Sequence, residues 1–172
     1  DYGPWRFTPR WDGGFTAAYF DHSGLYAFGR QAEALQWNLQ QLGSALRLVA
    51  PLESLSAVFQ NYAALYEAEL CKALFWRLGI EARDEQSNLA LVEALMDALA
   101  SDAISPDRFF FDWRGGRLRY AHSPAAAYYA SDKVQAFAQQ IADFAPVPHA
   151  CAHPYWEGDA PCTMWIEDVE AI

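Results

Sequence analysis

The first four residues of the chain, Asp1-Tyr2-Gly3-Pro4, have the composition of a loop that binds a metal ion beside phosphate groups. A loop carboxylate followed by glycine lets the backbone approach the phosphates of a nucleotide while a carboxylate oxygen binds Mg²⁺. Asp1 is therefore the candidate metal ligand. Asp-Tyr-Gly is also an ordinary turn sequence, and the triplet alone favours the turn. We single out no catalytic and no cofactor-binding residue in the chain.

A second group of side chains with possible metal chemistry lies near the other end of the chain: His149, Cys151, His153 and Cys162. Four nitrogen and sulfur ligands are the number that a structural zinc site needs. Their spacing differs from the usual Cys-x₂₋₄-Cys pairs, so an ordinary proline-rich loop is the favoured interpretation and zinc stays an alternative. A cysteine nucleophile is less favoured still, since nothing marks an oxyanion site or an orienting third residue.

Composition limits the classes of protein and partner. A chain of 172 residues with 53% hydrophobic and 16% aromatic residues suits one domain with a real core. It carries 12 basic and 22 acidic residues, a net charge of −10. Because phosphate backbones are bound by Lys and Arg, we expect neither nucleic acid nor anionic membrane as a partner. No signal-peptide pattern and no apolar run of roughly 20 residues is present, so the expected location is the cytoplasm.

Hydrophobic spacing predicts an all-α protein. Leu35, Leu39, Leu42, Leu46 and Val49 form one stripe on a first helix of about five turns. The expected helices are, in order, 31–49, a long one from 51 to a C-cap at Gly79, 85–100, 106–112 with Ser105 as N-cap, a short one after Ser123-Pro124, 131–144, and 163–172.

The chain is expected to form one domain in three parts. Residues 1–30 lack helical periodicity and are rich in Gly, Pro and aromatic residues, which predicts an irregular, activation-segment-like loop. Residues 31–145 form the helical domain, and residues 146–172 form a proline-rich loop with a C-terminal helix. We expect the loop 1–30 to be poorly ordered or to pack against a neighbouring molecule, because its natural neighbours would be missing.

Several motifs at the start of the chain recur together in a known family. Asp1-Tyr2-Gly3-Pro4 is followed by Asp21-His22-Ser23-Gly24-Leu25-Tyr26-Ala27-Phe28, then by Gln31 and by Trp37-Asn38-Leu39. This ordered set resembles the selenoprotein O family of kinase-like protein adenylyltransferases, and the resemblance is strongest over residues 1–50. Leu25 departs from it, because the family typically has Arg there. The Cys-x-x-selenocysteine or Cys-x-x-Cys element of many members is absent.

The resemblance implies a helical, C-lobe-like portion of a kinase-like fold. It implies transfer of AMP from ATP to Ser, Thr or Tyr hydroxyls of protein substrates, with Mg²⁺ or Mn²⁺ held partly by Asp1. The family's glycine-rich segment, lysine, glutamate and catalytic base precede the Asp-Tyr-Gly triplet and do not occur in residues 1–172. We therefore expect a C-terminal fragment of a longer parent, inactive and without cofactor by itself. The alternative is a non-catalytic helical module that binds other proteins.

Overall fold

The computed structural model describes residues 8–100, 104–119, 123–163, 165, 170 and 171. The α-helices in this part of the chain are α1 (Gln31–Leu46), α2 (Leu52–Gln60), α3 (Tyr62–Leu78), α4 (Glu85–Leu99), α5 (Pro106–Asp112), α6 (Ala126–Tyr129) and α7 (Asp132–Ile141). The expected all-α class is confirmed: these residues form no strand, only an isolated bridge between Ile80 and Pro146. They fall into two compact units, residues 12–70 and residues 8–11 with 71–171, so that α3 passes from one unit into the other.

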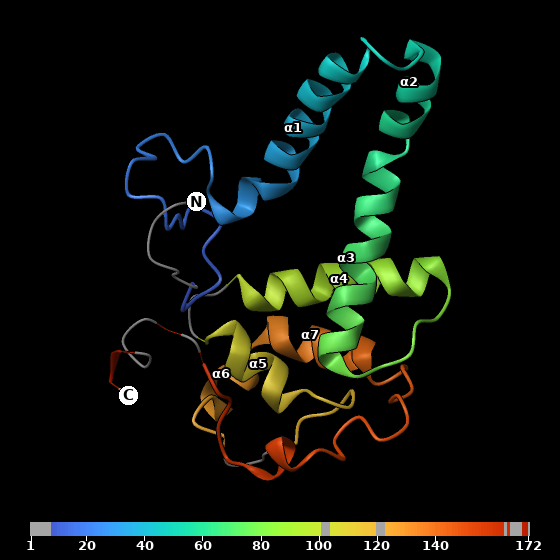
Figure 1. The fold of residues 1–172 in the computed structure, drawn as a ribbon. Coiled ribbons are helices and arrows are strands. Elements are labelled where there is room, and N and C mark those ends of the chain that lie inside the picture. Colours follow the sequence, from blue (N-terminus) through green and yellow to red (C-terminus); the bar gives the residue numbers. More distant parts are fainter. Residues whose placement is uncertain (1–7, 101–103, 120–122, 164, 166–169, 172) are drawn as a thin grey trace. The chain divides into compact units, whose positions relative to one another are not determined.

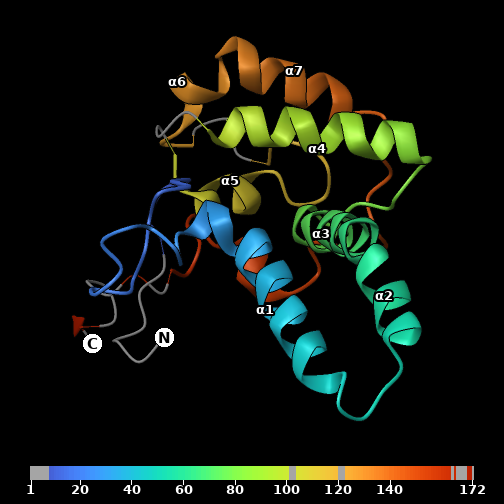
Figure 2. The ribbon, with the colours of Figure 1, turned by 90° about the horizontal axis from the view of Figure 1, so that it is seen from above.

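In the first unit, α1 and α2 form a helical hairpin whose tip is the turn at residues 47–51 (Figure 2). Gly43 is the buried residue of α1, because the ring of Phe59 lies directly against it. A Cβ atom at position 43 would lie 2.4 Å from two ring carbons of Phe59. The Tyr62 hydroxyl adds a hydrogen bond to the carbonyl of Ala32, 2.9 Å long. The contact with Phe59 thus joins α2 to α1, and the Tyr62 hydrogen bond joins the start of α3 to α1.

The structure corrects two expected helix boundaries in this unit. The long second helix is broken at Asn61, whose side-chain amide donates a hydrogen bond to the carbonyl of Ala57. Asparagine amides compete with the helical backbone for such carbonyls, which favours a break. The first helix ends at Leu46 instead of continuing to Val49. Leu48 and Val49 are 90% and 82% exposed, so no packing supports a further turn.

In the second unit, α4 and α7 lie side by side (Figures 1 and 2). Asp84 begins α4 by accepting hydrogen bonds from the backbone N–H and the hydroxyl of Ser87, and these bonds lower the pKa of its carboxyl. Leucines at every fourth position then turn one face of α4 inward. The fully buried residues of α4 and α7 are Leu91, Leu95, Ala98, Leu99, Val134 and Phe137, with Ile141 almost fully buried.

The short helix α5 places an aromatic cluster in the centre of the same unit. Ser105 caps it by accepting a hydrogen bond from the N–H of Arg108, and Pro106 occupies its first turn. Phe109 is fully buried, with its ring centroid 5.2 Å from that of Phe137 and stacked on Trp113. Offset and edge-on ring pairs of this kind add to the stability from buried area.

Most other expected helix ends are confirmed. Gly79 ends α3 with a left-handed backbone (φ 67°), as expected for a glycine C-cap. The loop after residue 146 contains a 3₁₀ turn at Pro154–Glu157. The last expected helix, 163–172, falls largely on residues outside the described part of the chain. Among the helices described, none has both the length and the apolar character that crossing a lipid bilayer requires.

Candidate functional site

The candidate metal ligand Asp1, with Tyr2 and Gly3, lies outside the described residues. The structure does describe the segment that follows in the motif series, residues 12–30, which precedes α1 in the first unit. This loop leads directly into α1.

Asp21 organises the centre of the loop. Its carboxylate accepts hydrogen bonds from the backbone N–H groups of Leu25 (2.8 Å) and Tyr26 (2.7 Å) and from the Ser23 hydroxyl (3.3 Å). Gly24 makes the turn possible with a left-handed backbone, φ 68°. Partial desolvation opposes ionisation, but the hydrogen bonds outweigh it and lower the pKa of Asp21 below 3.8. The ionised carboxylate of Asp21 therefore holds the turn 21–26 together, and we call this arrangement the Asp21 latch.

Backbone hydrogen bonds close the base of the loop. The N–H of Gly29 donates to the carbonyl of Gly13, and the N–H of Phe28 donates to the carbonyl of Phe15, both at 2.8 Å. A Cβ atom on Gly29 would lie 3.0 Å from the Gly13 carbonyl oxygen, so this close approach requires glycine. Residues 12–30 thus form intramolecular hydrogen bonds, in contrast to the poor order expected for the loop, whereas residues 1–7 lie outside the described part of the chain.

The closed loop carries aromatic side chains on its surface. Tyr19 is 80% exposed, and it packs edge-on against Phe20 at a centroid distance of 5.4 Å. Phe20 in turn packs edge-on against Tyr26 at 6.4 Å, and both are about half exposed. Exposed rings held in place in this way suit contact with another protein surface better than catalysis.

The sequence analysis did not identify the residue whose side chain fixes the geometry of this loop, which is Asp21. The spacing of an aspartate three residues before a glycine is the signal that could have identified the latch. The Trp37-Asn38-Leu39 segment lies on α1, with Trp37 59% exposed.

The four possible zinc ligands near residue 150 do not converge. Within the described residues, no group of three or more His, Cys, Asp or Glu side chains could hold a metal ion. Instead, Nδ1 of His153 accepts a hydrogen bond from the N–H of Tyr155, and the Cys151 thiol contacts the carbonyl of Arg114. The structure therefore does not support the zinc alternative for His149, Cys151, His153 and Cys162.

A buried carboxylate that the sequence analysis missed lies in the second unit. Asp112 is fully buried, and its Oδ2 accepts hydrogen bonds from Arg108 (2.9 Å), Ser123 (2.6 Å) and Tyr129 (2.7 Å). Burial and then this hydrogen bond raise the pKa of Tyr129 far above its ordinary value, so its hydroxyl stays a donor. A charged residue inside the apolar run Phe109–Trp113 is the signal that could have revealed a paired, buried group. The saturated arrangement on Oδ2 fits a structural role.

The sequence of this chain is similar to those of known proteins from one family. A family model described as protein adenylyltransferase SelO matches residues 1–145. The protein nucleotidyltransferase YdiU of Synechococcus elongatus is 36% identical over 127 residues, which cover 73% of this chain and 25% of that protein. The protein of the same name from Synechocystis sp. is 33% identical over 130 residues, covering 73% of this chain and 26% of the relative.

The relatives are much longer than this chain, which spans about a quarter of their length. The match nevertheless begins at Asp1 and continues through α7 (Asp132–Ile141), so it includes the loop, its latch and every α-helix described. Because residues 1–145 are well over half of the 172, the chain belongs to the SelO family of protein adenylyltransferases.

Proposed function

We propose that this chain is the C-terminal part of a protein adenylyltransferase that transfers AMP from ATP to Ser, Thr or Tyr hydroxyls of protein substrates. The observation that carries the proposal is the family match over residues 1–145, which includes the Asp-Tyr-Gly triplet and the Asp21 loop. The relatives named protein nucleotidyltransferase support the same class of chemistry. The cytoplasm is the proposed location.

In this proposal Asp1 is one ligand of the Mg²⁺ or Mn²⁺ ion that accompanies ATP. The ion would neutralise charge that develops on the phosphates during attack at the α-phosphate. Since the described residues contain no cluster that could hold a metal ion, we assign the remaining ligands to the nucleotide and to the preceding part of the parent. The role of the Asp21 latch is to fix the chain that leads from Asp1 into α1.

The experiment compares ATP labelled at the α- or the γ-phosphate, with the 172-residue chain and with the full-length parent. We expect the parent to transfer the α-label to protein, and the 172-residue chain to transfer neither label. Transfer of the γ-label would indicate kinase chemistry instead. Asp1→Ala in the parent should abolish transfer, whereas Asp143→Ala, an exposed carboxylate in a weak ion pair with Arg83, should leave it unchanged.

The exposed apolar side chains of the first unit favour a second candidate, a non-catalytic module that binds proteins. Outward-facing apolar residues on α1, α2 and the turn between them include Leu35, Trp37, Leu42, Leu48, Val49 and Val58. Patches of this kind mark interaction surfaces. The mass of the natively expressed protein separates the candidates, because a native product near 19.3 kDa would support the module and a much longer one the transferase.

A further inference from the structure

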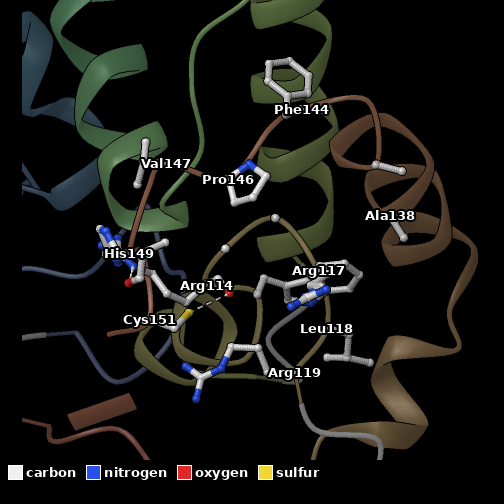
Figure 3. A pocket seen from close by; sticks show the side chains of 15 residues that line it. Arg114, Arg117, Leu118, Arg119, Ala138, Phe144, Pro146, Val147, His149 and Cys151 are labelled. Atoms are coloured by element: carbon white, nitrogen blue, oxygen red, sulfur yellow. Dashed lines mark hydrogen bonds between the residues drawn. The ribbon is translucent and has the colours of Figure 1, made fainter. Parts of the chain in front are cut away.

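A pocket of about 700 Å³ lies in the second unit, between the turn that follows α5 and the segment that follows α7 (Figure 3). Arg114, His149 and Cys151 lie along one side of it in this view, with Arg117 and Leu118 opposite. The apolar side chains around it include Leu118, Ala138, Ala142, Phe144, Pro146 and Val147. The pocket thus combines an apolar wall with nitrogen-bearing side chains.

The pocket is basic although the chain is acidic. Arg114, Arg117 and Arg119 fall within six consecutive residues, and they supply three of only 12 Lys and Arg in a chain of net charge −10. All three line the pocket, and its described lining contains no Asp or Glu. With no carboxylate in the lining to balance them, these arginines give the pocket a local positive potential.

Two of the arginines are held in fixed positions by backbone carbonyls. Arg114 donates hydrogen bonds to the carbonyls of Arg77 (3.1 Å) and Ala150 (3.0 Å), and Arg119 donates to the carbonyl of Trp156. Both guanidinium groups face the same indole ring of Trp156, 4.9 and 5.5 Å from its centroid. Both guanidinium groups are thus held in place before any ligand arrives, which reduces the entropic cost of binding.

Burial is the main reason why the pKa of the Arg114 guanidinium lies below its ordinary value. The neighbouring Cys151 side chain raises this pKa, and repulsion by the charge of Arg119 makes the smallest contribution and lowers it. A bound anion would relieve this repulsion. The hydrogen bonds of Arg114 use Nε and Nη1, so Nη2 remains without a partner among the described residues.

The third arginine, Arg117, and the histidine His149 have side chains that are available to bind a ligand. Arg117 and His149 are exposed, and neither side chain has a hydrogen bond or ion pair to any residue described. His149 also has a left-handed backbone (φ 61°), a costly conformation for a residue other than glycine and one that ligand sites often retain. Both side chains can therefore turn to a ligand without breaking an existing contact.

We propose that this pocket binds a small organic anion, a phosphate monoester or carboxylate with an apolar group. The anionic end pairs with Arg117 and with the free Nη2 of Arg114, because guanidinium groups match the geometry of phosphate and carboxylate oxygens. The apolar group lies against Phe144, Pro146 and Val147. The residues that line this pocket include neither Asp1 nor any residue of the loop 12–30, and the proposal does not depend on the proposed transferase activity.

The first test is titration of the 172-residue chain with phenyl phosphate, followed by calorimetry or amide chemical shifts. We expect saturable binding below about 10 mM, weaker binding of inorganic phosphate because it lacks the apolar group, and none of phenol. Arg117→Gln should weaken phenyl phosphate binding about tenfold, and Arg117→Lys less. Benzoate in place of phenyl phosphate shows whether carboxylates are accepted too.

The matched control is Arg47→Gln, which removes the same charge from an exposed arginine of the first unit, outside the pocket lining. It should change affinity less than twofold, or about 0.4 kcal/mol. Absence of saturable binding by the unmodified chain would overturn the proposal. Equal losses in the Arg117 and Arg47 variants would overturn it too, because they would show binding to net charge and not to this pocket.

The reactivity of two cysteines can show where on the chain the anion binds. Cys151 and Cys162 are both exposed, but only Cys151 lines the pocket. Phenyl phosphate should therefore slow alkylation of Cys151 by the neutral reagent iodoacetamide and leave Cys162 unaffected, as mass spectrometry of the two peptides will show. Equal rates for Cys151 with and without saturating ligand would place the bound anion elsewhere and refute the assignment.

Discussion

At the scale of single residues, Asp21 gives the loop 12–30 a dependence on pH. Its pKa in the folded chain lies below 3.8, so its contribution to loop stability is present above that pH and is lost as the pH falls through the folded value. We predict that the amide resonances of Leu25 and Tyr26 titrate together, with a midpoint below pH 3.8. The measurement is an NMR titration between pH 6 and about pH 2.5.

Asp21→Ala should abolish that titration and speed amide exchange at Leu25 and Tyr26, because both N–H groups lose their acceptor. Ser23→Ala is the control, since it removes only the 3.3 Å hydroxyl contact with the same carboxylate. A midpoint above 3.8, or unchanged exchange in the alanine variant, would show that Asp21 does not hold the turn.

The buried Asp112 makes the strongest single-residue prediction for stability. Asp112→Ala leaves Arg108, Ser123 and Tyr129 without their shared acceptor, so we expect a loss of about 3 kcal/mol in the free energy of unfolding. Urea denaturation measures it. Asp143→Ala removes an exposed carboxylate 3.8 Å from Arg83 and should cost less than about 0.5 kcal/mol. Similar losses in the two variants would show that the buried hydrogen bonds of Asp112 stabilise the fold no more than an exposed ion pair does.

At the scale of helices, the contact between Gly43 and Phe59 reverses an ordinary rule. Gly→Ala inside a helix usually stabilises by about 1 kcal/mol. Here the new Cβ would lie 2.4 Å from the Phe59 ring, so we predict that Gly43→Ala destabilises the first unit by about 1 kcal/mol. In a Phe59→Ala background the same change should stabilise the first unit. Urea denaturation of the original chain, the two single variants and the double variant measures both effects. The same sign in both backgrounds would show that the ring does not constrain position 43.

Helix boundaries were predictable where they depend on neighbouring residues. Ser105 with Pro106 and the glycine at position 79 act within one turn of chain, so their positions in the sequence were sufficient. The break at Asn61 was not predictable, because its apolar spacing fits one helix and a single side-chain hydrogen bond decides the outcome. The ring of Phe59 against Gly43 likewise depends on two helices meeting, which no local pattern encodes.

In the candidate site, too, features set by neighbouring residues were predictable and features that join distant residues were not. The Asp-Tyr-Gly triplet and the motifs after it were enough to indicate the family, because they are local and ordered along the chain. The closure of the loop through Gly13 and Gly29 joins residues sixteen positions apart and needed the structure. The basic pocket was hidden for a similar reason: the Arg114–Arg119 turn is visible in the sequence, but its apolar wall comes from residues 138–147.

At the scale of the whole molecule, the two units differ in how well they bury their own helices. Gly43 is the buried residue of α1, and the described side chains of α2 are all at least partly exposed. In contrast, α4 and α7 bury the leucines, valine, phenylalanine and isoleucine that form the core of the second unit. The difference fits the proposal that the first unit is completed by a preceding part of a longer parent, as the greater length of the relatives suggests.

Hydrogen exchange can measure this difference directly. Helices with few buried contacts open locally at low free energy, so amides of α1 and α2 should exchange about 100-fold faster than those of α4 and α7 in the 172-residue chain. In the full-length parent, α1 and α2 should become protected while α4 and α7 change little, because the added residues would cover the exposed apolar side chains of the first unit. Equal protection of all four helices in the short chain would instead mean that the first unit is stable alone. That result would favour the independent binding module over the fragment of a transferase.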